Sequence, residues 1–419
     1  MHIAVLGGGV VGVTAAYELW KDGHRVTLVE KNDSVGTETS WGNAGMIAPG
    51  HSFTWSSPKA PMIMLKSLVM RDQSIRFKPQ ADLRQWLWCL KFLGQCTAER
   101  SAANTARKYA IASYSQLVLH DTVRDVGLDY GKVDRGILYF YRSPERFEAG
   151  AEHMQIMARL GHTIEVLDRA QVLALEPALQ SVGDRIAGGI YCPTDESGSC
   201  HAFTTGLAAH LVKGGVEIRT GETVLALETA GDRVTAARTD KGSVKADAFV
   251  MALGNGSAAL SRSIGDPLPI WPIKGYSLTI PVGNNPAPPT IGSVDEENLV
   301  AVTRFDDMVR VTATAEIAGY STAHRPSDFA FMASVVRELY PEGADHDRAQ
   351  MWAGLRPMTP TNLPYIGRRK HANLWYDTGH GHIGWTMSHG SARLLADDVA
   401  GRTPALALEA VNDSWERRA

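Results

Sequence analysis

The sequence of 419 residues contains few cysteines, no long hydrophobic run and no strong net charge. Its four cysteines, Cys89, Cys96, Cys192 and Cys200, form no C-x-x-C pair, and no His/Cys cluster has the spacing of metal ligands. We therefore expect reduced, buried thiols and no bound metal. The net charge of −3 at pH 7 predicts no basic surface for phosphates, so we expect no nucleic-acid partner.

No apolar stretch approaches the roughly 20 residues that span a bilayer. An apolar run starts at His2, which leaves no room for a signal peptide, so we expect a cytoplasmic location. With 44% hydrophobic residues, a chain of this length can bury a large core and form two or three domains.

A glycine-rich turn is the most informative feature that is present. Residues 3–6 are apolar, residues 7–12 read Gly-Gly-Gly-Val-Val-Gly, and residues 13–19 have a helical pattern. A second apolar run, residues 25–29, ends at Glu30. This order of strand, turn, helix, strand and acid is typical of a dinucleotide-binding unit.

Each residue type in this motif has a physical role. Gly7 permits the tight turn, Gly9 lets the backbone approach a pyrophosphate, and Gly12 lets the helix pack closely on the strand. The helix N-terminus then presents unpaired N–H groups to the phosphates. Glu30 is placed to bind a ribose hydroxyl, although the motif alone does not distinguish NAD from FAD.

Four further segments carry a resemblance to a known family. They are residues 39–50 (TSWGNAGMIAPG), 272–277 (PIKGYS), 354–360 (GLRPMTP) and 378–387 (TGHGHIGWTM). With the N-terminal motif, they resemble the FAD-dependent amine and amino acid oxidoreductases of the D-amino acid oxidase superfamily. The chain most resembles bacterial D-amino acid dehydrogenases of the small-subunit type, over nearly its whole length. The resemblance favours FAD over NAD.

The resemblance implies a set of cofactor contacts. The ADP half of FAD would be held by Gly7, Gly9, Val10, Val11, Gly12, Glu30 and Lys31. The ribityl chain and one side of the flavin would be lined by Ser40, Asn43, Ala44, Gly45 and Met46. The adenine and pyrophosphate would meet Val224, Ala252, Leu253 and Gly254. The isoalloxazine would lie near Gly354 and over Gly379, His380, Gly381, His382, Ile383, Gly384, Trp385 and Thr386.

Some members of the superfamily bind their flavin covalently, through a histidine before the Ala-Gly pair or a C-terminal cysteine. Here Trp41-Gly42-Asn43 stands at the first place, and no cysteine follows Cys200. We therefore predict non-covalent FAD.

Three residues are candidates for the catalytic site. The resemblance places Arg356 at the substrate carboxylate, which a planar guanidinium binds with two hydrogen bonds. The alternative is a structural ion pair. The hydroxyl of Tyr276 would reach the same carboxylate, or else lie in water at the sheet surface. His51 would accept an amine proton or tune substrate choice, or else be a loop histidine without a catalytic role. We assign no general base.

The resemblance implies oxidative deamination of a D-amino acid, with hydride transfer from the α-carbon to the flavin and release of a 2-oxo acid and ammonia. Alternatives are a dehydrogenase of cyclic D-imino acids such as D-proline, an oxidase that uses dioxygen, and a flavin-binding electron-relay subunit. The expected electron acceptor is a quinone or another carrier.

A candidate contact surface for the acceptor is the stretch of residues 62–93, where basic and apolar residues are interleaved. Its apolar residues include Leu68, Val69 and Met70, and the basic ones, with Lys59 just before the stretch, are Lys59, Lys66, Arg71, Arg76, Lys78, Arg84 and Lys91. Such a segment suits peripheral contact with anionic lipid at the inner face of the cytoplasmic membrane. An internal helical cap over the substrate is the alternative.

We expect a mixed α/β fold with a Rossmann-like FAD-binding domain. A second glycine-rich turn, residues 379–384, precedes a helical pattern over residues 385–400. The two glycine turns lie at opposite ends of the chain, so we expect the domain to be discontinuous. The predicted FAD-binding segments are residues 1–55, 195–268 and 350–419. Residues 56–194 and 269–349 would form a substrate or cap domain, built on an antiparallel sheet with helices.

Overall fold

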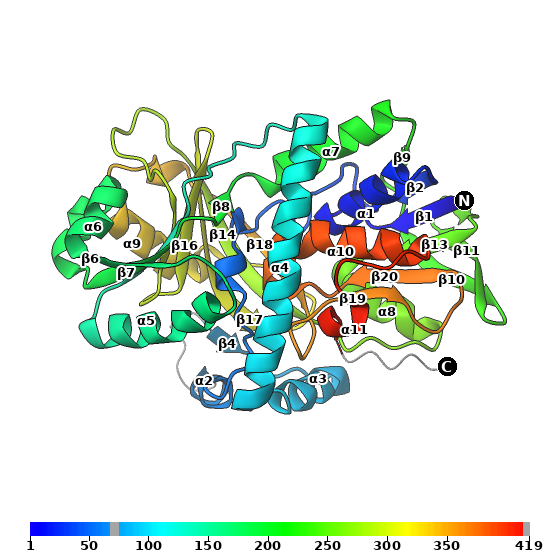
Figure 1. Ribbon diagram of the computed structural model, residues 1–419, viewed down its shortest axis with the longest axis horizontal. Coiled ribbons are helices and arrows are strands. Elements are labelled where there is room, and N and C mark those ends of the chain that lie inside the picture. Colours follow the sequence, from blue (N-terminus) through cyan, green and yellow to red (C-terminus); the bar gives the residue numbers. More distant parts are fainter. Residues whose placement is uncertain (68–74, 414–419) are drawn as a thin grey trace.

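The protein is described by a computed structural model that covers residues 1–67 and 75–413. Two large sheets lie at opposite ends of the molecule, and one long helix crosses between them (Figure 1). The first sheet has the strand order β19-β20-β13-β1-β2-β9, and only β19 is antiparallel to its neighbour. Its strands are β1 (His2–Leu6), β2 (Arg25–Val29), β9 (Glu217–Arg219), β13 (Ala248–Met251), β19 (Tyr365–Arg368) and β20 (Leu374–Thr378).

The second sheet has nine strands in the order β18-β14-β17-β16-β15-β5-β7-β6, with β4 paired to β17. Its pairs are antiparallel except β15 with β5 and β17 with β4. The strands are β4 (Ile75–Phe77), β5 (Ile137–Tyr141), β6 (Glu165–Asp168), β7 (Gly188–Cys192), β14 (Trp271–Pro281), β15 (Gly292–Asp295), β16 (Val300–Phe305), β17 (Met308–Ile317) and β18 (Gln350–Met358). β18 belongs to this sheet, although the predicted FAD-binding segment starts at residue 350.

Two small sheets complete the strand pairing. β10 (Val224–Ala230), β11 (Arg233–Thr239) and β12 (Gly242–Val244) form an antiparallel meander. β3 (Met46–Ile47) pairs with β8 (Glu196–Ser197) at the end of the loop of residues 41–46.

Helices cover both sheets and join them. They are α1 (Val10–Lys21), α2 (Ala60–Ser67), α3 (Leu83–Leu93), α4 (Ala98–Val126), α5 (Pro144–Arg159), α6 (Arg169–Leu175), α7 (Cys200–Lys213), α8 (Ser257–Ser263), α9 (Ala330–Leu339), α10 (Gly384–Val399) and α11 (Leu408–Val411). Among the described residues, none of these helices is both long and apolar enough to cross a membrane.

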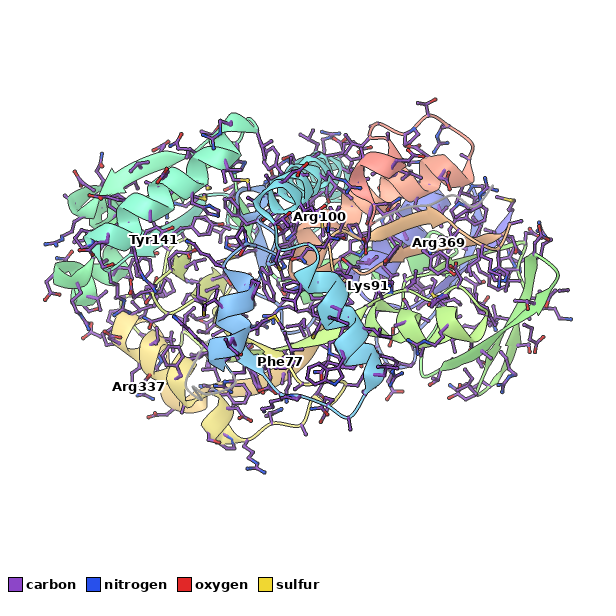
Figure 2. The ribbon with its side chains drawn as sticks, turned by 90° about the horizontal axis from the view of Figure 1, so that it is seen from below. Phe77, Lys91, Arg100, Tyr141, Arg337 and Arg369 are labelled. Atoms are coloured by element: carbon purple, nitrogen blue, oxygen red, sulfur yellow. The ribbon has the colours of Figure 1, made fainter. Side chains whose placement is uncertain are left out.

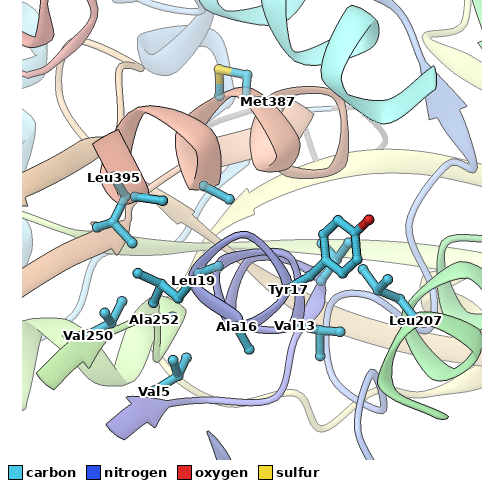
Figure 3. Packing of buried hydrophobic residues seen from close by; sticks show 14 of the residues in the cluster. Val5, Val13, Ala16, Tyr17, Leu19, Leu207, Val250, Ala252, Met387 and Leu395 are labelled. Atoms are coloured by element: carbon cyan, nitrogen blue, oxygen red, sulfur yellow. The ribbon is translucent and has the colours of Figure 1, made fainter. Parts of the chain in front are cut away.

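The main core places α1 against the parallel sheet and against α10. Val5, Val13 and Leu19 are fully buried there with Val250 and Leu395 (Figure 3). Apolar residues three and four apart along α1 produce this buried face. The first residues of both helices are thereby fixed beside the sheet's carboxyl edge.

An ion-pair network joins the same two helices. Arg393 on α10 contacts Glu18 at 2.5 Å and Asp22 at 2.6 Å, both at α1, and Asp397 at 3.1 Å. Arg402 adds pairs with Asp22 and Asp397. The network fixes the axial position of α10 relative to α1, which apolar packing alone leaves free to slide.

Candidate active site

A single cavity of about 1230 Å³ extends from the N-terminal glycine turn to helices α2 and α3. Among the predicted cofactor residues, all except Gly12 and Gly45 line it. Arg356, Tyr276 and His51 line it too. The fold therefore brings together segments that lie more than 300 residues apart in the sequence.

The first glycine turn has the geometry of a phosphate cradle. Gly7 has φ +109°, and a β-carbon on Gly12 would lie 1.9 Å from the Gly7 carbonyl oxygen. Neither position accepts a side chain. Gly9 caps α1 without a side-chain hydrogen bond of its own, Ser40 Oγ accepts the Val10 N–H at 2.9 Å, and the helix N-terminus lies against the cavity. Glu30 accepts the Gly8 N–H at 2.7 Å, which places its carboxylate beside the turn.

The loop of residues 41–46 is held by Arg310, a residue that the sequence motifs missed. Its Nη1 donates to the carbonyl oxygens of Trp41 and Asn43, each at 2.9 Å. Arg310 is 5% exposed, and burial lowers its pKa to about 10. Gly45 adopts φ +68°, and its N–H donates to Asn43 Oδ1 at 2.9 Å. No local pattern identifies Arg310, because it is one polar residue within an ordinary strand.

The second glycine turn leads into α10. Gly379 and Gly381 have φ +81° and +63°, and no side chain caps the helix N-terminus. The Thr386 hydroxyl accepts the Ala48 N–H at 3.2 Å and so ties β3 to α10. The positive end of the helix dipole thus faces the cavity, where it favours negative charge.

The two histidines of this turn have different surroundings. His380 is 2% exposed, and its Nε2 lies 2.9 Å from Ser391 Oγ and 3.2 Å from Asp377 Oδ1. Its ring is therefore held within the fold. His382 stacks on Trp55, with ring centroids 4.5 Å apart, and its Nε2 lies 2.9 Å from Lys108 Nζ.

Lys108 is a second residue that sequence reasoning missed. It is fully buried on α4 and donates to the Phe53 carbonyl oxygen at 3.1 Å, in addition to its contact with His382. Burial lowers the pKa of Lys108 well below its ordinary value, and burial likewise lowers that of His382. Burial therefore disfavours the charged form of both side chains.

Arg356 lies on β18 and points over Gly275 of β14. A β-carbon on Gly275 would meet three guanidinium atoms of Arg356 at 2.4–2.6 Å. Its Nη1 donates to the Thr314 carbonyl oxygen at 3.2 Å, and its Cζ lies 5.8 Å from the centroid of Trp55. No carboxylate among the described residues forms an ion pair with it. Burial lowers its pKa to about 10, so it is charged at neutral pH.

Tyr276 lies on β14, on the face of the sheet opposite to the one that carries Arg356. Arg356 is opposite Ile273 in the register, so Arg356 shares a face with Ile273 and Gly275, and Tyr276 points away from it. The ring of Tyr276 packs against Phe329 at 5.4 Å, and its hydroxyl is buried without a hydrogen bond. The structure thus does not bring this hydroxyl to the guanidinium, and its catalytic role stays a prediction.

His51 ends the short 3-10 helix at residues 49–51 and stacks on Tyr139, with centroids 5.4 Å apart and planes 3° apart. Burial, with a smaller effect of Lys108, lowers the His51 pKa to about 4. The preceding Gly50 donates its N–H to Asp195 at 3.2 Å. His51 is therefore neutral and a weak base at neutral pH.

The fold also gathers three side chains that showed no metal-ligand spacing in the sequence. His162, Cys192 and Asp195 offer ligand atoms within 4.8 Å of one another. A β-carbon on Gly50 would lie 2.6–2.8 Å from all three. The group therefore packs directly against the backbone that leads to His51.

Trp352 is a further cavity residue that the motifs did not indicate. Its ring covers both Gly42 and Gly354, because a β-carbon on either glycine would lie within 2.3 Å of the ring. Trp352 lies on β18 together with Arg356, so its ring connects that strand to the loop of residues 41–46. The sequence signal that could have indicated Trp352 is its position two residues before Gly354 on β18.

Comparison with known proteins agrees with this geometry. A family described as "FAD dependent oxidoreductase" matches residues 2–398. A "D-amino acid dehydrogenase 2" of Mesorhizobium japonicum is 42% identical over 407 residues, which cover 97% of this chain and 98% of that protein. A "D-amino acid dehydrogenase" of Methylobacterium radiotolerans is 42% identical over 408 residues, or 97% of each chain.

Solved structures share the fold at lower identity. Glycine oxidase from Bacillus cereus has a TM-score of 0.73 at 21% identity and covers 99% of each chain. L-proline dehydrogenase from P. horikoshii has a TM-score of 0.72 at 18% identity, with coverage of 97% of this chain and 95% of that one. With the open glycine turns described above, the full-length family match shows that the chain belongs to the DAO family of FAD dependent oxidoreductases and uses FAD as its cofactor.

Proposed function

We propose that this enzyme oxidises D-amino acids to imino acids, which hydrolyse to 2-oxo acids and ammonia. The observation that carries the proposal is Arg356, a cation in the cavity that has no carboxylate partner among the described residues. The curated relatives that carry the name D-amino acid dehydrogenase support the substrate class. Bound FAD supplies the acceptor for the hydride of the α-carbon.

The protein's own contribution is alignment. Arg356 pairs with the substrate carboxylate, and the hollow over Gly275 fixes where its guanidinium lies. His51 and His382 are uncharged, so they do not repel the substrate ammonium and can accept its hydrogen bonds. With a pKa of about 4, His51 is a weak proton acceptor, which agrees with assigning no general base.

Replacement of Arg356 tests the carboxylate role. We expect Arg356→Ala to raise the Michaelis constant and lower turnover strongly, while FAD content stays near that of the wild type. Arg159→Ala, at an exposed site on α5, is the matched control. Unchanged kinetics in Arg356→Ala would refute the role.

Anaerobic flavin bleaching with a panel of substrates separates the alternative functions. Bleaching by D-amino acids but not by L-amino acids supports the proposal, whereas bleaching by D-proline alone indicates a dehydrogenase of cyclic imino acids. No bleaching by any of them indicates an electron-relay subunit. A coupled peroxidase assay in air identifies an oxidase through its hydrogen peroxide.

We also propose that electrons leave to a quinone at a surface formed by α2 and α3. The inner side chains of these helices line the cavity, among them Ile63, Met64, Trp88 and Phe92. Their outer side chains include large exposed apolar groups, namely Met62, Leu65, Leu83, Trp86, Leu87, Leu90 and Leu93. Figure 2 shows both helices on one face of the molecule, with Lys91 on α3. A cavity wall that is also an apolar surface suits an acceptor dissolved in lipid.

The predicted apolar pattern included Leu68, Val69 and Met70, and the basic one Arg71; these four lie outside the described residues. Sedimentation with anionic liposomes tests contact with the inner face of the membrane. We expect the wild type to sediment and a variant with Lys59, Lys66, Arg84 and Lys91 changed to Glu to remain in solution. No sedimentation of the wild type would end the membrane proposal.

The division into two discontinuous domains is likewise proposed. Strands of the parallel sheet come from within residues 1–55, 195–268 and 350–419. Most strands of the second sheet come from residues 56–194 and 269–349, with β18 as the exception.

A further inference from the structure

Glu296 is an ionisable side chain in the cavity that the mechanism above does not use. β15 and β5 run parallel, with Val294 opposite Tyr139 in the register. Side chains two residues apart on a strand share a face, so Glu296 and Tyr141 point the same way as that pair. All four line the cavity. Tyr141 is labelled in Figure 2.

A rigid turn fixes the position of Glu296. Asp295 is fully buried, and its carboxylate accepts the N–H groups of Glu297 at 3.0 Å and Asn298 at 3.2 Å. Arg142 also pairs with it, at 2.6 Å. Leu299 closes the turn in the left-handed region, with φ +53°. Each backbone hydrogen bond of this turn therefore helps to direct Glu296 toward the cavity.

The carboxyl group of Glu296 has no hydrogen-bond or ion-pair partner among the described residues. Arg146, whose charge lowers the pKa of Glu296, pairs with Glu297 at 3.3 Å. Burial, together with the charge of Asp295, raises the pKa of Glu296 to about 7. A half-buried acid without a partner is harder to ionise than one in water, so a cationic ligand there would gain a charge-assisted hydrogen bond.

Contacts along residues 51–55 connect Glu296 with Arg356. At one end His51 stacks on Tyr139, which lies on the face of Glu296. At the other end Trp55 lies under Arg356. Four residue steps span at most about 14 Å. Residues 51–55 thus contact Arg356 at one end and, through Tyr139, the face that carries Glu296 at the other, and the cation and the acid line the same cavity.

We propose that Glu296 binds the distal cation of the substrate side chain and that the enzyme prefers D-amino acids with basic side chains. This inference rests on the proposed function, because it takes the substrate carboxylate to lie at Arg356. A ligand with a carboxylate at one end and an ammonium at the other complements both unpaired groups. Tyr139 and Tyr141 then cover the methylene chain.

Two non-oxidisable ligands test the proposal without turnover. 6-Aminohexanoate has both charges but no α-amine, and hexanoate lacks the ammonium. By calorimetry on the holoenzyme at pH 8, we expect 6-aminohexanoate to bind about 10- to 100-fold more tightly than hexanoate. Glu296→Gln should abolish this difference, whereas Glu148→Gln, at an exposed site on α5, should keep it. Equal binding of the two ligands to the wild type would overturn the proposal.

The pH dependence of ligand affinity gives an independent test. Asp295 and Arg146 act on the Glu296 carboxyl, which in turn acts on Tyr139 and Tyr141; Glu297 is its neighbour in the chain and pairs with Arg146, and His153 lines the same cavity. Because its pKa is about 7 in the free enzyme, the carboxylate forms as the pH rises from 6 to 8. Affinity for 6-aminohexanoate should increase over this range, and affinity for hexanoate should not. If the affinity for 6-aminohexanoate does not rise with pH, the assignment of Glu296 as the group that binds the ammonium is contradicted.

Kinetics with D-lysine and D-norleucine separate failure of this inference from failure of the proposed function. We expect Glu296→Gln to lower kcat/KM for D-lysine about 10- to 100-fold and to leave D-norleucine within twofold. Equal losses for both substrates would place Glu296 at the α-amine and overturn the inference. If the wild type oxidises D-norleucine as well as D-lysine, the inference fails and the proposed function stands. If it oxidises no D-amino acid, the proposed function fails.

Discussion

Gly275 lies directly beneath the guanidinium of Arg356 and so controls its position. Because Gly275 has no side chain, the guanidinium lies directly over its α-carbon, where a β-carbon would be 2.4 Å from Nη1. The residue lies in a strand and does not adopt a positive φ. Gly275→Ala therefore suits the backbone and acts only through the space that the methyl group takes.

The size of the effect follows from that contact. Ordinary van der Waals contact starts at 3.4 Å, so the guanidinium must move by about 1 Å. The clash is with the end of a flexible side chain, so it costs little stability, and alanine in place of glycine reduces the entropy of the unfolded chain. A misplacement of about 1 Å lowers the rate roughly 100-fold. We thus expect a large kinetic loss with an unchanged or slightly raised Tm.

A double-mutant cycle measures whether the loss acts through Arg356. Anaerobic stopped-flow reduction of the flavin by a D-amino acid gives kcat/KM for the wild type, Gly275→Ala, Arg356→Ala and the double variant. We expect Gly275→Ala to add no further loss once Arg356 is absent. Wild-type kinetics in Gly275→Ala would refute the reasoning, and so would an undiminished loss in the Arg356→Ala background.

Four further outcomes are expected. Arg310→Met leaves the carbonyl groups of Trp41 and Asn43 unpaired, at about 1–3 kcal/mol each, so FAD affinity should fall in a calorimetric titration of the apoprotein. Guanidinium denaturation followed by ultrafiltration should leave all flavin in the filtrate, since we predict non-covalent binding. Arg393→Met should lower the free energy of unfolding in urea by about 3–5 kcal/mol, because it leaves the buried Glu18 carboxylate without its ion-pair partner, whereas Asp22 and Asp397 keep Arg402. Burial alone would raise the pKa of Asp22, but hydrogen bonds from Arg393 and Arg402 outweigh it, so the pKa lies below its ordinary value of 3.8. The stability that the ionised Asp22 contributes should therefore disappear as the pH falls below 3.8.

The sequence predicts local elements well where a pattern has one physical meaning. The helix expected after the first glycine turn is α1, and the one expected from residue 385 is α10, which begins at Gly384. Close packing of Gly12 on Gly7 agrees with its predicted role. These features depend on backbone geometry within a few residues, which composition and spacing report directly.

Residues that act across the fold left no such pattern. Lys108 reads as one basic residue in a long amphipathic helix, yet it is fully buried against His382. Arg310 and Glu296 lie in plain strand or turn sequences. Strand alternation also separates Tyr276 from Arg356, although both belong to family-like motifs. Such relations depend on register between distant strands, which a single sequence does not specify.

The two glycine turns meet because of strand order, not because of any contact between them. β20, β13 and β1 are parallel neighbours, so their carboxyl ends lie at one edge of the sheet. The turn after each strand contributes a cavity residue there, namely Gly379, Gly254 and Gly7. Ligands of open parallel sheets bind at this edge, where helix N-termini converge. Both helix N-termini therefore face the same cavity, to which β18 contributes Arg356 and the turn after β15 contributes Glu296.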